Sequence, residues 1–158
     1  LVVSSRPGAL GLKRAEAVGI QTLSLSKEIY DDPLTADEVI ATELRRRDVD
    51  YVVMAGYMRM VHYPILRTFP SRVVNIHPAL LPSFPGMHGP RDALNHGVKV
   101  SGATIFLVDS GVDTGRILAQ GAVDVLPDDT VETLHERIKV VERRLLVETV
   151  RAWNEGEK

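Results

Sequence analysis

Asn75-Ile-His77-Pro-Ala-Leu-Leu-Pro82-Ser-Phe-Pro85-Gly86 is the stretch that decides the fold. It continues an apolar run that starts at Arg72, and the run predicts a short strand that Pro78 ends. Successive strand side chains point to opposite faces, so Asn75 and His77 share one face. The proline-rich segment that follows fits neither a helix nor a central strand. We therefore expect a shaped loop at the end of a sheet strand, a common place for a ligand pocket.

The residue types on that strand point to chemistry at a carbonyl group. Asn75 can donate a hydrogen bond from its amide, and His77 can move protons near pH 7. A third candidate is Asp113, in the turn Asp109-Ser-Gly-Val-Asp-Thr-Gly115. Asp and Gly are also simply good turn formers. However, a carboxylate can orient an imidazole and stabilise its charged form, so the three residues predict a proton-transfer site with an oxyanion donor.

A zinc site is the competing interpretation of the histidines. No two of the five histidines stand four residues apart, and none belongs to a close carboxylate-histidine motif. We therefore expect no metal. Gly8 and Gly11, near the start, match no phosphate-binding glycine loop.

Length and composition are those of one globular domain. The chain has 158 residues, a formal net charge of −2 and no cysteine. This length supports a single core, and the charge gives no general case for binding nucleic acid or an anionic membrane. Without cysteine there is no disulfide or thiolate nucleophile, which fits a cytoplasmic protein. No apolar run approaches the roughly 20 residues that span a bilayer.

Strand-like and helix-like segments alternate along the chain, which predicts an α/β fold with a largely parallel sheet. The expected strands cover residues 1–3, 21–25, 51–55, 72–77, 101–109 and 116–126. The expected helices cover residues 9–18, 35–47, 64–68 and 91–95, with a long last helix running to about residue 154. Capping-box spacing at Thr35/Glu38 and Asp129/Glu132 marks two helix starts. There is no repeat and no convincing linker, so we expect one domain of residues 1–158.

The last helix carries a second candidate surface. His135, Lys139 and Glu142 stand four and three residues apart and therefore share one face. They flank an apolar stripe of Leu134, Ile138, Val141 and Leu145. The sequence leaves two interpretations open, a solvated flank with an ion pair or a face that meets a ligand.

From about Gly8 to the C-terminus, the chain resembles phosphoribosylglycinamide formyltransferase, the folate-dependent glycinamide ribonucleotide transformylase of purine synthesis. The matching motifs are Ala55-Gly-Tyr-Met-Arg59, the Asn75 to Gly86 stretch, Val112-Asp-Thr-Gly115 and Leu134-His-Glu-Arg-Ile-Lys-Val-Val-Glu142. The Asn-x-His-Pro segment and the Asp-x-Gly turn are shared by the wider formyltransferase superfamily. The Pro-Ser-Phe-Pro-Gly ending and the Arg-Ile-Lys-x-x-Glu pattern favour the glycinamide ribonucleotide branch. The resemblance implies a Rossmann-like three-layer sandwich with a mostly parallel central sheet.

The resemblance implies formyl transfer from 10-formyltetrahydrofolate, a co-substrate, to the amine of glycinamide ribonucleotide in de novo purine biosynthesis. Asn75 would bind the formyl oxygen as it becomes an oxyanion, His77 would shuttle a proton, and Asp113 would orient His77. The implied pterin-binding residues, acting largely through backbone groups, are Met58, Arg59, Met60, Val61, Val108, Asp109, Val112 and Asp113. The implied contacts of the nucleotide are Met58, Ile76, Pro78, Lys139 and Glu142, with Glu142 at the ribose hydroxyls. Both partners are small molecules, and a homodimer is left open.

Three departures from the family pattern stand out. Members begin with a strand and a Gly-Ser-rich phosphate loop that opens the first helix, and this chain has no positions for them. We therefore expect an N-terminally incomplete domain. Ile105 stands where the branch usually carries a histidine near the site, and at this position the chain looks more like methionyl-tRNA formyltransferase. Arg116 stands where a proline is common. The alternatives are another amine acceptor, methionyl-tRNA or an amino sugar, and a non-catalytic folate-binding fragment.

Overall fold

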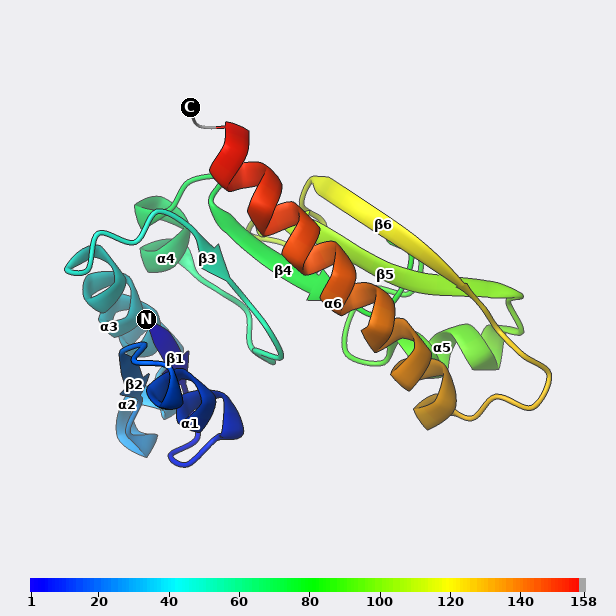
Figure 1. The fold of residues 1–158 in the computed structure, drawn as a ribbon, viewed down its shortest axis with the longest axis horizontal. Coiled ribbons are helices and arrows are strands. Elements are labelled where there is room, and N and C mark those ends of the chain that lie inside the picture. Colours follow the sequence, from blue (N-terminus) through cyan, green and yellow to red (C-terminus); the bar gives the residue numbers. More distant parts are fainter. Residues whose placement is uncertain (157–158) are drawn as a thin grey trace. The chain divides into compact units, whose positions relative to one another are not determined.

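The computed structural model describes residues 1–156, with side chains to residue 153 (Figure 1). Its contacts group into two compact units. The first unit comprises residues 1–51 and 61–70, and the second comprises residues 52–60 and the described chain from residue 71 onward. Each unit has its own sheet. The single domain expected from the sequence remains a prediction.

The first unit is a small parallel pair of strands with helices. Its strands β1 (Val2–Ser4) and β2 (Thr22–Ser24) pair in parallel, with Val3 opposite Leu23. Its helices are α1 (Leu10–Ala17), α2 (Lys27–Asp31), α3 (Pro33–Arg45) and α4 (Tyr63–Thr68). The segments lie close to the predicted ones, except that α2 was not predicted.

The cap of α3 is Asp32, so the predicted start at Thr35 and Glu38 is wrong. Oδ1 of Asp32 accepts hydrogen bonds from the backbone N–H groups of Leu34 at 3.0 Å and Thr35 at 3.2 Å. Pro33 occupies the first turn, where its missing N–H costs nothing and its fixed φ suits a helix. The helix therefore begins at Pro33, after the aspartate cap, and not at the predicted cap Thr35.

The second unit is a four-stranded sheet in the order β3-β4-β5-β6. Its elements are β3 (Val52–Val53), β4 (Val73–His77), α5 (Gly89–His96), β5 (Val100–Leu107), β6 (Ile117–Asp124) and α6 (Val131–Gly156). The α/β class is confirmed, but the sheets are mixed. Parallel pairing holds for β1–β2 and β3–β4, whereas β4–β5 and β5–β6 are antiparallel. Residues 108–116 join β5 to β6. A connection of this length is too short for the crossover that parallel neighbours need, so the two strands pair antiparallel.

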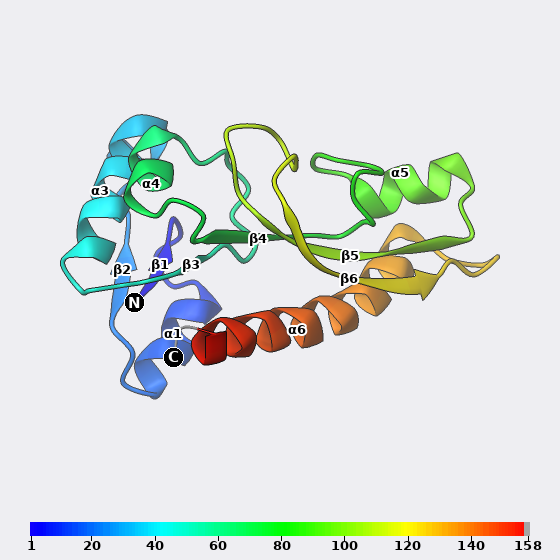
Figure 2. The same cartoon turned by 90° about the horizontal axis from the view of Figure 1, so that it is seen from above.

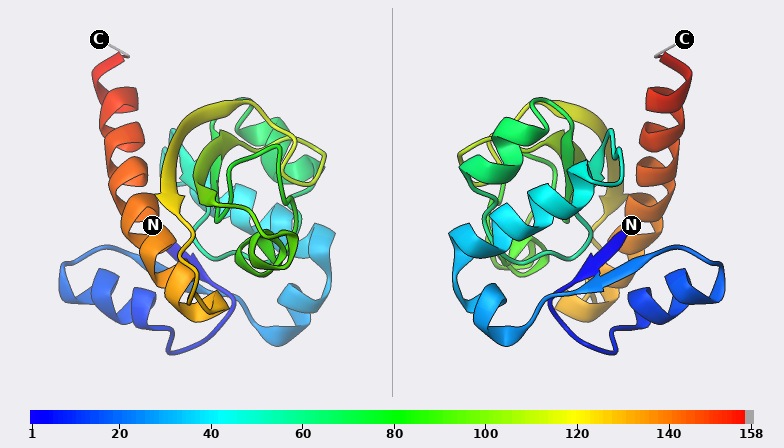
Figure 3. Two further views of the ribbon diagram at one scale, coloured as in Figure 1. Left: turned by 90° about the vertical axis from the view of Figure 1, so that its right-hand side faces the viewer. Right: turned by 90° about the vertical axis from the view of Figure 1, so that its left-hand side faces the viewer.

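The two faces of this sheet have different roles. Figure 2 shows α6 running along one face of the sheet, and Figure 3 shows α6 (orange to red) beside β6 (yellow). The core cluster on that face comprises Val74, Ala103, Ile105, Leu107, Val123, Leu134, Ile138 and Leu145. Because strand side chains alternate, the opposite face carries Asn75 across from Phe106 and His77 across from Thr104. One face thus builds the core and leaves the other for the candidate site.

The predicted position of Ile105 near the site is wrong. Ile105 is fully buried in the core cluster against α6. It pairs with Ile76, whereas the residue of β5 opposite Asn75 is its neighbour Phe106. A one-residue step along a strand changes the face, so Ile105 fills the core and gives no ground for a different acceptor.

The helix α6 is capped by Thr130 and Thr133, one residue later than predicted. The backbone N–H of Thr133 donates to Oγ1 of Thr130 at 3.3 Å, and that of Thr130 donates to Oγ1 of Thr133 at 2.9 Å. Asp129 serves a different purpose, because its carboxylate binds the Arg137 guanidinium through two hydrogen bonds of 2.8 and 2.9 Å. Arg137 thereby holds the pKa of Asp129 well below its usual range. Among the described residues, no helix is both long and apolar enough to cross a membrane.

Candidate functional site

The centre of the site is the contact between His77 and Asp113. His77 ends β4 and is 3% exposed. Its Nδ1 atom lies 3.4 Å from Oδ2 of Asp113, in the connection between β5 and β6. The same Oδ2 accepts the backbone N–H of Gly86 at 2.7 Å. Asp113 therefore joins the β5–β6 connection to both His77 and the proline-rich loop after β4.

The other nitrogen of His77 also faces an acceptor. Its Nε2 atom lies 2.7 Å from the backbone carbonyl oxygen of Phe84, in the proline-rich loop. Nε2 must donate in this contact, because a carbonyl oxygen can only accept. The imidazole is consequently anchored at both nitrogens, between a carboxylate and a carbonyl.

Asn75 supplies the amide of the candidate site. It lies two residues before His77 on β4, is half-buried, and stands opposite Phe106 in the antiparallel register. The structure therefore puts its amide on the sheet face of the His77 imidazole, and it brings Asp113 to that imidazole.

A buried hydroxyl fixes the start of the proline-rich loop. Thr104 Oγ1 donates to the carbonyl of Ala79 at 2.7 Å and accepts the N–H of Leu81 at 3.0 Å. Nε2 of Gln120, on β6, donates to that hydroxyl at 3.0 Å and to the Leu81 carbonyl at 2.9 Å. Sequence reasoning missed Thr104 and Gln120. The available signal was a polar residue in the apolar run Ala103-Thr-Ile-Phe-Leu107, at a position that alternation places opposite the core face.

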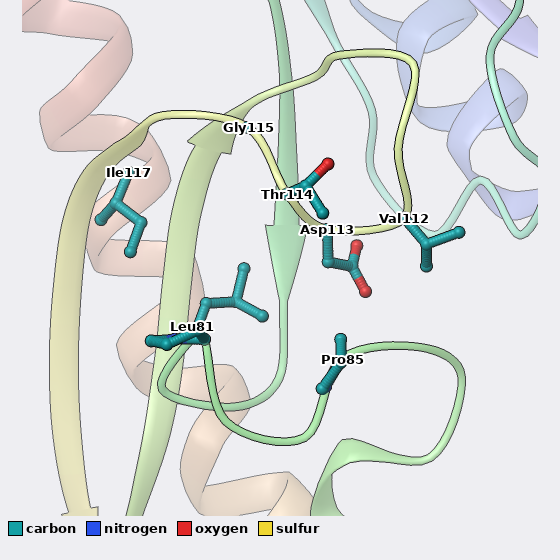
Figure 4. A pocket seen from close by; sticks show the side chains of 8 residues that line it. Leu81, Pro85, Val112, Asp113, Thr114, Gly115 and Ile117 are labelled. Carbon is teal, nitrogen blue, oxygen red and sulfur yellow. The ribbon is translucent and has the colours of Figure 1, made fainter.

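An open pocket of about 260 Å³ lies between the proline-rich loop and the β5–β6 connection. Its lining residues are Leu81, Pro82, Pro85, Val112, Asp113, Thr114, Gly115 and Ile117. Figure 4 shows the Asp113 carboxylate directed toward the side of the pocket that carries Pro85. The walls are mainly apolar, and Asp113 is the one ionisable group among them. Gly115 is required there, since a Cβ at that position would lie 1.6 Å from the carbonyl oxygen of Leu107.

The implied pterin-binding residues divide between the pocket and other places. Val112 and Asp113 line it, and Asp109 shapes the turn by accepting from Gly111 N at 2.9 Å and Thr114 Oγ1 at 2.7 Å. Val108 lies at the end of β5, where its N–H donates to the carbonyl of Val73 at 2.8 Å. None of the residues Met58, Arg59, Met60 and Val61 lines this pocket.

Those four residues follow β3 and differ in exposure. Met58 and Met60 are exposed, and Arg59 is half-buried. Val61 is 5% exposed and belongs to the first unit, so its side chain serves packing. Only its backbone remains for the implied binding role.

Of the implied nucleotide contacts on β4 and just after it, one packs into the core and the other lies beside the site. The side chain of Ile76 packs against the core cluster, on the sheet face away from Asn75. Pro78 is half-buried beside the site, where its carbonyl oxygen would lie 2.9 Å from a Cβ at Gly89.

The candidate surface on α6 combines a surface ion pair with a half-buried acid. Lys139 Nζ binds Oε1 of Glu136 at 2.6 Å, so the ion-pair partner of Lys139 is Glu136 and not Glu142. Burial raises the pKa of Glu142, against the opposing charges of Lys139 and Arg143. Burial and then the charge of Lys139 lower the pKa of His135. A half-buried acid beside cations suits a polar ligand better than a plain solvated flank does. Among the described residues, no group of three or more His, Cys, Asp or Glu side chains is placed to hold a metal ion.

The chain is similar in sequence to several known proteins. The chain is 57% identical over 116 residues to phosphoribosylglycinamide formyltransferase of Mycobacterium tuberculosis, covering 73% of this chain and 54% of the relative. It is 36% identical over 162 residues to the Bacillus subtilis enzyme of the same name, covering 100% of this chain and 83% of the relative. It also matches 10% of the trifunctional purine biosynthetic protein adenosine-3 of Drosophila melanogaster, at 45% identity over 148 residues.

A solved structure agrees with these relatives. The crystal structure of glycinamide ribonucleotide transformylase 1 from Symbiobacterium toebii superposes with a TM-score of 0.94 at 46% identity, covering 98% of this chain and 73% of that chain. The chain thus spans about half the length of the Mycobacterium relative and most of the Symbiobacterium structure. Residues 1–150 match the formyl transferase family, and the chain belongs to it.

Proposed function

We propose that the protein transfers a formyl group from 10-formyltetrahydrofolate to the amine of glycinamide ribonucleotide. The observation that carries the proposal is the His77–Asp113 contact on the sheet face that also holds Asn75. An amide donor, an imidazole and a carboxylate are the groups that acyl transfer to an amine requires when the acceptor brings its own nucleophile. The assignment to purine synthesis rests on the similarity to phosphoribosylglycinamide formyltransferases and to glycinamide ribonucleotide transformylase 1.

In the proposed reaction, the amine nitrogen forms a bond to the formyl carbon. The carbonyl electron pair moves onto oxygen, where the Asn75 amide donates a hydrogen bond to the developing oxyanion. The attacking amine loses a proton to Nδ1 of His77, which faces Asp113, while Nε2 keeps its own proton on the Phe84 carbonyl. The bond from the formyl carbon to N10 of the folate then breaks, N10 receives a proton, and the carbonyl re-forms on the product. Asp113 holds the His77 ring and stabilises its positive charge while it carries the extra proton.

The pocket supports binding of the folate's flat pterin ring. It offers apolar walls for the ring faces, and backbone groups of residues 112–115 for the polar edges. Glu142, half-buried on α6, is proposed to accept hydrogen bonds from the ribose hydroxyls of the nucleotide, with Lys139 beside it. The absence of cysteine fits a reducing compartment, so we propose the cytoplasm as the location.

A formyl-transfer assay with three acceptors tests the function. Purified protein would receive 10-formyltetrahydrofolate with glycinamide ribonucleotide, methionyl-tRNA or an amino sugar. We expect transfer to the ribonucleotide, slowed by about 100- to 1000-fold in Asn75→Ala and retained in Asn95→Ala, an exposed asparagine on α5. A preference for either other acceptor would overturn the assignment. Calorimetry that finds folate binding without nucleotide binding would instead support a folate-binding fragment.

A further inference from the structure

We propose that Phe84, supported by the ring of His96, is a positioning residue that holds the His77 imidazole through its backbone carbonyl. The inference rests on the proposed function and deepens it. It adds a second anchor for the imidazole, on the side opposite Asp113. His96 acts only through Phe84, because its ring contact is with the Phe84 side chain.

The first supporting observation is the hydrogen bond itself. Nε2 of His77 and the Phe84 carbonyl oxygen are 2.7 Å apart, at the short end of the range for N–H···O bonds. His77 is 3% exposed, so bulk water has little access to compete for Nε2. With Asp113 at Nδ1, both ring nitrogens meet acceptors. This arrangement suits a ring that is protonated at both nitrogens, and it prevents the ring from turning over.

The second observation is the backbone conformation that aims this carbonyl. Phe84 has φ +55°, in the left-handed region, which non-glycine residues adopt only when their surroundings enforce it. Strain of this kind gathers at functional sites, where it directs a group that ordinary backbone would point elsewhere. The next glycine, Gly86, gives its N–H to Asp113. The loop therefore binds His77 through the Phe84 carbonyl and Asp113 through the Gly86 N–H.

The third observation is a side-chain contact that can support this conformation from α5. The rings of Phe84 and His96 have centroids 5.7 Å apart and planes inclined by 63°, the edge-to-face arrangement that favours aromatic pairs. His96 is the last residue of α5. The other end of α5 approaches His77 directly, because a Cβ at Gly89 would lie 3.4 Å from Nε2 of His77. The helix α5 thus supports the imidazole at its first turn and the Phe84 loop at its last.

The test reads the His77 ring in the intact protein, with or without turnover. Long-range ¹H–¹⁵N spectra would report both imidazole nitrogens of His77, identified by the signals that His77→Gln removes. The variants are His96→Ala, which deletes the supporting ring, and His96→Phe, which keeps an aromatic ring. The matched control is Met87→Ala, in the same loop and 66% exposed.

We expect His96→Ala to shift the Nε2 resonance and lower kcat by about 2- to 12-fold, the range for one aromatic pair. The KM for folate should stay the same. His96→Phe should restore both the resonance and kcat, and Met87→Ala should change neither. Phe84→Leu, which removes the other ring of the pair, should reproduce the His96→Ala shift.

Unchanged Nε2 signals in both His96→Ala and Phe84→Leu would overturn the inference. So would a fall in kcat without any change at Nε2, because it would mean that the ring pair acts by another route. If the wild-type protein transferred no formyl group, the proposed function would fail, while the nitrogen signals would still decide whether Phe84 positions His77.

Discussion

Nδ1 of His77 and Oδ2 of Asp113 meet at 3.4 Å, with side chains that are only 4% and 12% exposed. The two residues come from different segments, the end of β4 and the β5–β6 connection. Asp113 reaches the imidazole with φ +54°, a left-handed conformation that aspartate tolerates better than most residues. Because water is largely excluded, a charge on one group is strongly felt by the other. This contact is the feature on which the catalytic predictions depend.

Asp113→Asn should lower kcat for formyl transfer by about 100-fold, at the low end of the range for acid–base assistance. Asparagine keeps the size of the side chain and can still accept the Gly86 N–H. It cannot, however, offset a positive charge on His77 during proton transfer. Steady-state kinetics would measure the change, with Asp128→Asn, at an exposed position, as the control. A kcat close to that of the wild type would contradict the orienting role of Asp113.

Asn75→Ala should reduce kcat by about 100- to 1000-fold, the scale for one lost oxyanion donor. The loss should fall on kcat more than on KM, because the hydrogen bond strengthens only as charge develops on the formyl oxygen. The control is Asn95→Ala on α5. Equal losses in both variants would show a general effect on the fold rather than an oxyanion role.

Much of this fold could be predicted from periodicity and helix-ending residues alone. The alternation in residues 72–77 places Asn75 and His77 on one face, and the register confirms that face. Gly97 ends α5 with φ +74°, as a glycine just past a helix does. The cap positions of α3 and α6 could not be predicted, because several Asp, Thr and Glu residues compete within a few positions of each other.

The site was less predictable, because its contacts join distant segments. A turn sequence cannot show that Asp113 meets His77 rather than only closing its own turn. The acceptor at Nε2 is a backbone carbonyl, which no residue type reveals. The mistaken position of Ile105 came from counting along a motif without assigning sheet faces, since one step along β5 separates a core residue from a site residue.

Thr104→Val should lower the free energy of unfolding by about 2 to 6 kcal/mol. The change keeps the shape of the side chain but leaves the buried Ala79 carbonyl and Leu81 N–H without their hydroxyl partner, and each unsatisfied group costs about 1 to 3 kcal/mol. Urea denaturation would measure the loss. Ser101→Ala, on the same strand, is the matched control, because the buried Ser101 hydroxyl has no hydrogen-bond partner among the described residues. Its removal should leave stability unchanged or raise it by about 1 kcal/mol.

Glu142→Gln should change how stability depends on pH. Burial raises the pKa of Glu142 above its ordinary value of 4.5, so the folded protein binds this proton more tightly than the unfolded chain does. Between the two pKa values the folded state carries more protons, and the free energy of unfolding therefore falls as pH rises through that window. Glutamine does not titrate, so the variant should gain stability relative to the wild type as pH rises from about 4 to about 7.

Urea titrations at each pH would measure this gain, with Glu148→Gln, exposed on the same helix, as the control. The control reports the effect of replacing an exposed glutamate on the same helix. A difference that stays flat with pH for Glu142→Gln would show that burial does not hold the proton on this carboxyl group. In the same variant, the proposed contact with the ribose hydroxyls predicts a higher KM for the nucleotide and an unchanged KM for the folate. A rise in both KM values would point to a disturbed α6 instead, because Glu142 is proposed to touch only the nucleotide.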